Sequence, residues 1–442
     1  MTAAGRRERT IELVRIAFRN LGRHKVKTII TTTAVALGIL AYLYMDAFLL
    51  GTNTESRRNL INFETGAAKI YSHAYWDKRE ELPLYEGFTG YADIAERLRR
   101  GGYAVAPRAT FVGSLLSQEE ELPFLFFGVD PDAERRVFRY HRYIDPECGG
   151  HFPANGAFEI LLGIKGAKDL GARTGDTVRL STVIDKRDEA GVLRHINQVI
   201  DLLVAGVINS PDPIVNGYVG YLPLSILQDE AGILLEGQVT ELIIRKAGAR
   251  EDELPGRFES PQAIERELGD GLPASLVVVG WQENALDYLA ASAADVVQSI
   301  VFLGFFFVIV LMVIANTVLM AVLERTREIG MLRALGMTDA SVVKLFSIET
   351  GLIGLLGALI GLILFLPLNY WMVNYGIDYS PMMEEAGLSN LGYRVVGIFK
   401  SAWNLPSMAL SVVGATILSS ATALLPSLRA VRMTITSALR SE

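Results

Sequence analysis

The sequence predicts an α-helical membrane protein with four transmembrane helices and a large mixed α/β domain of two lobes between the first two helices. The first observation is a set of four long stretches without Asp, Glu, Lys or Arg, namely Thr28 to Met45, Val296 to Leu323, Thr350 to Ile377 and Ser401 to Leu428. About 20 apolar residues in a helix cross the hydrocarbon core of a bilayer. The second observation is the long block at 51–295, which is polar and rich in strand patterns. The third is its acidic character, which contrasts with basic chain ends.

Composition excludes several other classes. The chain has 442 residues, of which 50% are hydrophobic and 21% charged, so it is not intrinsically disordered. The formal net charge of −7 and the acidic block argue against nucleic-acid binding, which needs a basic surface. Cys148 is the single cysteine, so neither an intramolecular disulfide nor a C-x-x-C motif is possible.

Charge bias predicts the topology. Short cytoplasmic loops are enriched in Lys and Arg, and residues 1–27 form a basic segment with the pattern of an interfacial amphipathic helix. We expect a multi-pass protein of the cytoplasmic (inner) membrane with both termini in the cytoplasm and an uncleaved first span. The predicted segments after 1–27 are a span at 28–50, an outer domain at 51–295, a span at 296–323, a cytoplasmic loop at 324–348, a span at 349–376, an outer loop at 377–404, a span at 405–428 and a cytoplasmic tail at 429–442.

The outer domain has a mixed pattern. Segments rich in Val, Ile and Leu predict strands, and these lie at 67–71, 122–129, 177–184, 199–208, 239–244 and 275–279. Helices are expected at 91–100 and 261–268. We expect a more β-rich middle lobe at about 115–240, and a stalk helix at 284–295 that continues into the second span.

Motifs for catalysis are missing. The sequence has no G-x-x-x-x-G-K-[ST] phosphate-binding loop and no H-E-x-x-H pair, and its five histidines are scattered. We therefore predict no catalytic residue, no metal site, no cofactor on this chain and no enzymatic activity. Asp46 and Glu349 are acids within or beside predicted spans. For Asp46 we favour a carboxylate that reaches outer water, and for Glu349 an ion pair with Lys344 or another basic group.

The loop between the second and third spans is amphipathic. Ile329, Leu332 and Leu335 share one helical face, Gly336 can end that helix, and Thr338 can cap the next one. A helix lying between two spans with an exposed apolar side needs a partner.

This loop resembles the corresponding loop of the FtsX-like, MacB-type ABC transporter permeases, whose motif is close to E-R-T-R-E-I-G-x-L-R-A-L-G. The predicted ATPase-coupling residues are Glu324, Arg325, Arg327, Glu328, Ile329, Gly330, Leu332, Arg333, Leu335 and Gly336. The tail LPSLRAVRMTITSALRSE, the opening IAFRNLGRHKVKTIITTTAVALGI and the segment LGARTGDTVRL resemble other parts of the same family.

The resemblance implies a mechanism and partners. A separate cytoplasmic ABC ATPase, present in two copies and carrying the ATP and magnesium, would dock on the loop helix. A second permease, identical or homologous, would complete a dimer in the lipid bilayer. ATP-driven motion would then pass mechanically to a MacB-like outer domain.

Two branches of the family compete. The segments YMDAFLLG and INFETGAAKIYSHAYWD, together with Trp281, look closer to lipoprotein-releasing (LolC/LolE-like) permeases, which implies lipoprotein cargo and a periplasmic acceptor. The alternative is a MacB-like exporter of drugs, toxins or peptides. An FtsX-like signalling permease and a membrane-anchored enzyme rank lower, the latter because it leaves the loop helix unexplained.

Lipoprotein release would need an apolar cleft between the outer parts of the first two spans. Bulky apolar residues there are equally typical of lipid-facing positions. The predicted cleft residues are Tyr42, Met45, Phe48, Leu49, Ile300, Leu303, Phe306 and Phe307.

Overall fold

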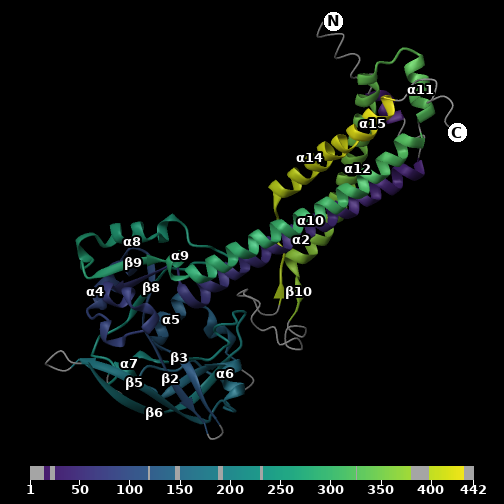
Figure 1. The fold of residues 1–442 in the computed structure, drawn as a ribbon. Helices are drawn as coiled ribbons and strands as arrows, with labels where there is room; N and C mark the ends of the chain where they lie inside the picture. The colour runs from purple at the N-terminus through teal and green to yellow at the C-terminus, as the bar shows by residue number, and fades with distance from the viewer. Residues whose placement is uncertain are drawn as a thin grey trace. The chain divides into compact units, whose positions relative to one another are not determined.

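The structure, a computed structural model, describes residues 14–19, 25–117, 120–144, 150–187, 193–228, 232–324, 326–379 and 398–432 (Figure 1). Cys148, Arg325 and most of the predicted tail lie outside these residues. The chain forms two compact units. We call Met1–Thr52, Ala293–Ile377 and Phe399–Glu442 the membrane unit, and Asn53–Ser292 with Asp378–Ile398 the inserted domain.

Four helices are long and apolar enough to cross a membrane, as the sequence predicts. They are α2 (Lys25–Asn59), α10 (Leu286–Glu324), α12 (Asp339–Asn374) and α14 (Leu405–Thr422). Residues 14–19 are also helical, and two further short helices are α11 (Thr326–Ala334) and α15 (Leu424–Val431). The strands β10 (Ile377–Asp378) and β11 (Ile398–Phe399) form a two-stranded sheet.

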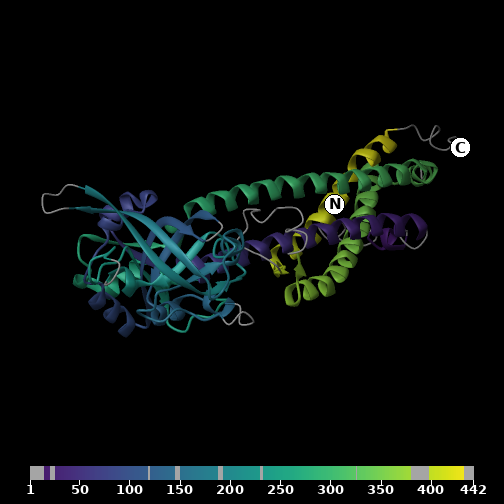
Figure 2. The ribbon, with the colours of Figure 1, turned by 90° about the horizontal axis from the view of Figure 1, so that it is seen from below.

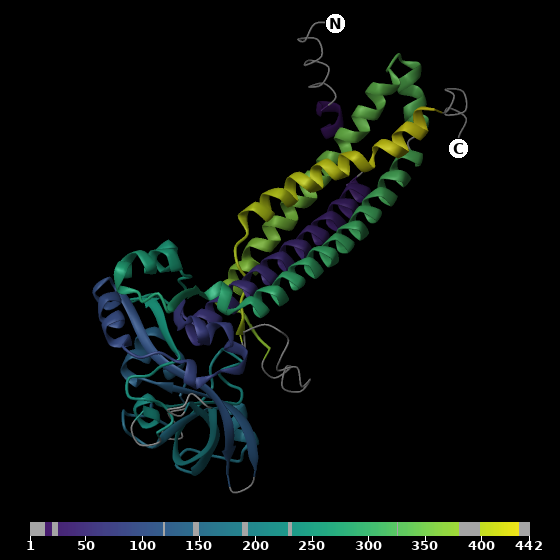
Figure 3. The same cartoon turned by 60° about the vertical axis from the view of Figure 1, so that its left-hand side comes forward.

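A row of glycines on α12 sets the packing of the membrane unit, and Figure 3 shows α14 running alongside this helix. Gly351 and Gly354 face Ser420 and Ser419 of α14, whereas Gly357 and Gly361 face α2. A Cβ atom at Gly357 would lie 2.7 Å from Cβ of Val35, closer than real side chains approach. Small residues at i and i+3 or i+4 let helix backbones come together in a membrane, so this row of glycines lets α12 pack closely against both α14 and α2.

The inserted domain is built on a nine-stranded sheet, whose long strands can be followed in Figure 2. The strands are β1 (Ala68–Ser72), β2 (Tyr103–Leu116), β3 (Glu121–Val129), β4 (Glu159–Gly163), β5 (Thr177–Arg187), β6 (Leu193–Ile208), β7 (Val219–Pro223), β8 (Glu241–Lys246) and β9 (Leu276–Gly280).

The long strand β2 belongs to two parts of this sheet. Its first half pairs with β8, in the order β2-β8-β1-β9, and all these pairs are antiparallel. Its second half pairs with both β3 and β5, which closes the ring β2-β3-β7-β4-β6-β5. Closure leaves no free strand edge in that ring. The division into two lobes stays a prediction, because β2 is common to both parts.

Short helices cover the sheet. They are a π-helical turn (Leu60–Thr65), α3 (His73–Asp77), α4 (Tyr91–Arg100), α5 (Pro131–Val137), α6 (Ile164–Asp169), α7 (Leu224–Gln228), α8 (Pro261–Leu268) and α9 (Trp281–Asn284). In α4, Ile94, Ala95 and Leu98 are buried on one face, because residues three or four positions apart lie on the same side of a helix. Figure 1 shows α4 and α8 beside β8 and β9.

Candidate functional site

The predicted coupling loop forms a helix and a tight turn. Helix α11 is followed by Gly336, whose φ of 94° suits glycine and ends the helix as predicted. Thr338 occupies the N-cap position of α12 with extended backbone, although its hydroxyl lies 2.8 Å from Oγ of Ser341 and does not accept a backbone N–H. Across the turn, Arg333 Nε donates to Oδ1 of Asp339 at 2.8 Å. The turn therefore holds α11 at a defined angle to α12.

The described side chains of α11 divide into an inner and an outer set. Gly330 is buried, and Glu328, Leu332 and Arg333 are half-buried. Leu335 is 80% exposed and Met331 51% exposed. The side chains of Glu324, Arg327 and Ile329 are outside the described set, as is Arg325. Of the apolar residues predicted for the docking face, Leu335 is the one seen to point outward, and Met331 joins it.

The predicted cleft residues are divided between two helices. Tyr42, Met45, Phe48 and Leu49 of α2 are half-buried, and the Phe48 ring stacks on Phe399 with centroids 6.1 Å apart. Tyr42 packs against the apolar core of the membrane unit. On α10, Ile300 is 64% exposed and Phe307 half-buried, while the side chains of Leu303 and Phe306 are not among those described.

Polar side chains link α2 and α12 to the start of α14. Asp46 Oδ2 accepts a hydrogen bond from Nδ2 of Asn404 at 2.8 Å, and Asn404 caps α14 through Ser407 N–H. Asn369 is fully buried in α12 and its Oδ1 accepts from Ser401 Oγ at 2.7 Å. Asp46 therefore has a structural partner. The ion pair expected for Glu349 stays a prediction.

A buried polar network that the sequence did not indicate lies in the inserted domain. Glu241 on β8 accepts from Lys69 Nζ at 2.8 Å and from Tyr71 and Thr110 hydroxyls at 3.0 and 3.1 Å. Burial opposes ionisation of Glu241, but Lys69, Arg108 and the hydrogen bonds outweigh it, so the pKa of this carboxyl lies below its usual value.

Next to it, Arg108 forms a fully buried ion pair with Glu134 of α5. The guanidinium carbon of Arg108 lies 4.7 Å from the ring centroid of Phe127 and 4.5 Å from that of Phe138. These residues come from strands and helices far apart in sequence, so no local motif marks them. Among the described residues, no group of three His, Cys, Asp or Glu could hold a metal ion.

The comparisons with known proteins concern the helical part first. Residues 300–435 match the family model described as FtsX-like permease C-terminal. This range contains the described helices α11, α12, α14 and α15 and most of α10. The helical part of the chain within this range is therefore similar to the FtsX-like permeases.

Relatives extend the match to the rest of the chain. The chain is 24% identical over 421 residues to the lipoprotein-releasing system transmembrane protein LolC of Neisseria meningitidis, covering 94% of each chain. It is 22% identical over 413 residues to an uncharacterized ABC transporter permease of Methanocaldococcus jannaschii, covering 91% of each. The ABC transporter permease YtrF of Bacillus subtilis is 37% identical over 81 residues, 18% of this chain and 16% of that one. These matches confirm that the chain resembles the FtsX-like permeases of ABC transporters.

One solved structure is also similar, the extracellular domain of the noncanonic ABC-type transporter YknZ from Gram-positive bacteria. It is 16% identical, with a TM-score of 0.30, and the match covers 49% of this chain and 100% of that chain.

Proposed function

We propose that the chain couples ATP hydrolysis by a separate cytoplasmic ATPase to movement of the inserted domain, and that it thereby releases lipoproteins from the inner membrane. Both termini lie in the cytoplasm in this proposal, and two ATPase copies and a second permease complete the transporter. ATP and magnesium are held by the ATPase.

The outward apolar side of α11 carries the coupling part of the proposal. Met331 on α11 and Leu335 in the turn directly after it are exposed, and the Arg333–Asp339 ion pair spans that turn. Exposed apolar residues rimmed by charge are typical of an interaction site. Helix-in-groove docking uses such anchors, and the family model that includes this helix belongs to ABC permeases, which work with an ATPase.

The proposal that the protein releases lipoproteins is supported by fewer observations than the proposal that it couples to an ATPase. The match to a lipoprotein-releasing permease spans nearly the whole chain, inserted domain included. The match to the archaeal permease is almost as long, and that name assigns no cargo. A MacB-like exporter of drugs, toxins or peptides is therefore the second candidate function.

The cargo would be held by its acyl chains against the outer parts of the first two spans. Exposed Ile300 and half-buried Phe307 on α10, and half-buried Met45 and Leu49 on α2, give apolar surface for such contacts. Acyl chains gain about 0.8 kcal/mol per buried CH₂ group, so an apolar surface serves this cargo better than a polar channel.

A substitution at Leu335 tests the coupling. Leu335→Asp would place a carboxylate in the proposed contact, at a cost of several kcal/mol. We expect the ATPase that co-purifies with the wild-type chain, recognised by its ATP hydrolysis, to be lost from the detergent-solubilised complex.

Ala340→Asp is the matched control, because Ala340 is exposed in the first turn of α12, where a helix N-terminus tolerates an acid. Retention of the ATPase by Leu335→Asp, or its equal loss from Ala340→Asp, would reject α11 as the docking element.

A further inference from the structure

A pocket of about 280 Å³ opens into the inserted domain at the point where β2 changes partners. Arg108 marks this point, because in the strand register it lies opposite Glu241 of β8 on one side and opposite Val129 of β3 on the other. Residues of β1, β2, β3, β7 and β8 line the pocket, together with parts of α3 and the π-helical turn. The volume is near the lower end of the range for small-molecule sites.

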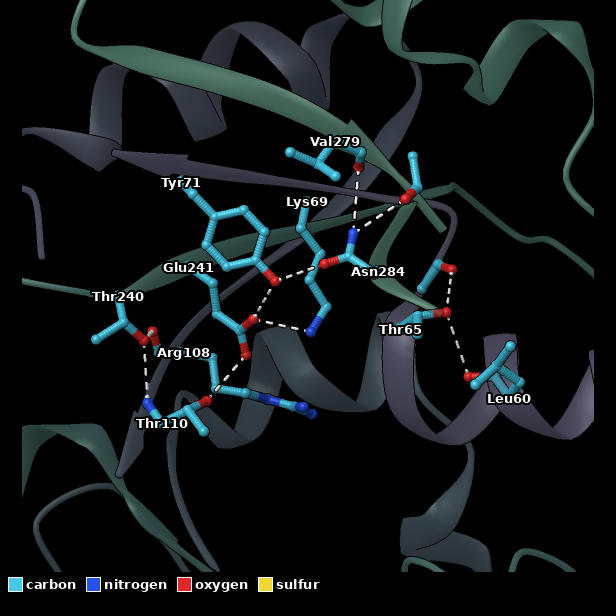
Figure 4. A network of polar contacts seen from close by, with 12 residues as sticks. Leu60, Thr65, Lys69, Tyr71, Arg108, Thr110, Thr240, Glu241, Val279 and Asn284 are labelled. Atoms are coloured by element: carbon cyan, nitrogen blue, oxygen red, sulfur yellow. Dashed lines mark hydrogen bonds and ion pairs between the residues drawn. The ribbon is translucent and has the colours of Figure 1, made fainter. Parts of the chain in front are cut away.

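The acceptors on the pocket floor are already occupied. Both oxygens of Glu241 accept hydrogen bonds, Oε1 from Thr110 and Oε2 from Lys69 and Tyr71 (Figure 4). The Tyr71 hydroxyl also lies 2.8 Å from Oδ1 of Asn284, and the amide of Asn284 donates to Gly280 O at 3.1 Å. Among the described residues, the neighbouring Glu134 Oε2 is a buried acceptor without a partner, but Glu134 does not line the pocket.

Donors, in contrast, have unused capacity. Lys69 Nζ carries three N–H groups and has Glu241 as its one partner among the described residues. Arg108 donates through Nη2 to Glu134, and its Nε has no hydrogen-bond partner within the described chain. Tyr221, a residue only 2% exposed, also lines the pocket and carries a hydroxyl that can donate. The charged groups facing the pocket are Lys69, Arg79, Arg108, Glu64 and Glu241.

The walls are apolar and partly aromatic. Phe63, Leu125, Phe127 and Val219 line the inside. At the mouth, the half-buried Trp76 lies under exposed Arg79, whose guanidinium carbon is 4.4 Å from the ring centroid. Arg108 itself is held between two phenylalanine rings, so its planar fork keeps one orientation. Such a fork matches a carboxylate.

We propose that this pocket binds a small organic acid with an apolar, flat body. Its carboxylate lies against Lys69, Arg108 and Tyr221, and its body against Trp76 and Phe127. The inference concerns the inserted domain alone and does not depend on the cargo proposed above.

The test uses the full chain in lipid nanodiscs and three probes that share one body, 3-phenylpropionate, 3-phenylpropan-1-ol and 3-phenylpropylamine. Saturation-transfer NMR measures binding, with protein-free nanodiscs as the blank. We expect the acid to bind at least tenfold more tightly than the alcohol, and the amine more weakly still. Equal binding of the three head groups, or no binding of the acid, would overturn the proposal.

Tyr221→Phe supplies the site-specific control, because it removes one donor and keeps the buried ring. Loss of one hydrogen bond should weaken binding of 3-phenylpropionate about fivefold and leave the alcohol less affected. Tyr103→Phe is the matched variant, since the Tyr103 hydroxyl donates to Phe258 O and does not line the pocket. Equal affinity of the two variants for the acid would place its binding elsewhere and reject the site.

Discussion

Arg108 shows what a single residue contributes to the inserted domain. It is 1% exposed, it pairs with Glu134, and it stands where β2 leaves β8 for β3. A buried ion pair adds little net stability relative to apolar residues, but breaking one leaves an unpaired charge in the core. Arg108 therefore neutralises the buried charge of Glu134 at the point where β2 changes partners.

Arg108→Met tests this role. We expect the inserted domain to lose about 3–5 kcal/mol of unfolding free energy, because Glu134 would stay buried without its cation. Hydrogen exchange of β2 and β8 in the detergent-solubilised chain measures the loss. Arg179→Met removes the exposed Arg179–Asp201 pair of the same domain and should have a much smaller effect. Similar protection in both variants would contradict the assignment.

His141 predicts a pH dependence. Burial and the nearby cations Arg142, Arg135 and Arg139 lower the pKa of His141 from 6.5 to about 4. Because the folded value is the lower one, the unfolded chain takes up the proton first as the pH falls. Stability linked to His141 is therefore complete above pH 6.5 and is lost progressively between about pH 6.5 and pH 4.

The measurement compares urea unfolding of wild type and His141→Gln at pH 7 and pH 5. We expect the wild type to lose about 1 kcal/mol more than the variant between these values, after discounting for the partial exposure of the ring. An identical loss in both proteins would mean that His141 keeps an ordinary pKa.

At the scale of elements, apolar periodicity and turn residues predicted much of the structure. Each of the four charge-free stretches overlaps one of the four long helices, and Gly336 and Thr338 mark the turn between α11 and α12. The strand β2 was missed, because Pro107 and Gly113 interrupt its pattern and such residues weaken a strand prediction. The pocket was missed for a different reason. Lys69, Arg108 and Glu241 meet only through long-range strand pairing.

The glycine row of α12 gives a prediction at this scale. A side chain at Gly354 would collide with Ser419 and with the backbone of Ala415 in α14. Gly354→Leu should therefore destabilise the membrane unit by about 1–3 kcal/mol through overpacking, seen as a lower thermal unfolding midpoint in detergent. Gly414→Leu is the matched control on α14, because a Cβ there meets nothing within 4 Å. Equal midpoints for the two variants would show that the helices do not pack through this row.

At the scale of the whole molecule, the two units carry different functional features. The membrane unit carries the family match and α11, the helix proposed to dock the ATPase. The inserted domain carries the buried polar network and the pocket beside it. Coupling can therefore be inferred from the family, whereas cargo has to be measured.

Depletion of the protein separates the two candidate functions. If it releases lipoproteins, its loss should leave them in the inner membrane, because their acyl chains hold them in the bilayer unless work is done to extract them. Density fractionation of membranes, followed by detection of a triacylated lipoprotein, measures this directly, and re-expression of Leu335→Asp should fail to restore sorting where Ala340→Asp succeeds. If the protein is an exporter, depletion should raise sensitivity to a drug or peptide while lipoproteins remain correctly sorted. Correct sorting after depletion, in a cell with no second such permease, would reject lipoprotein release and leave the coupling helix and the pocket unaffected, since neither depends on the cargo.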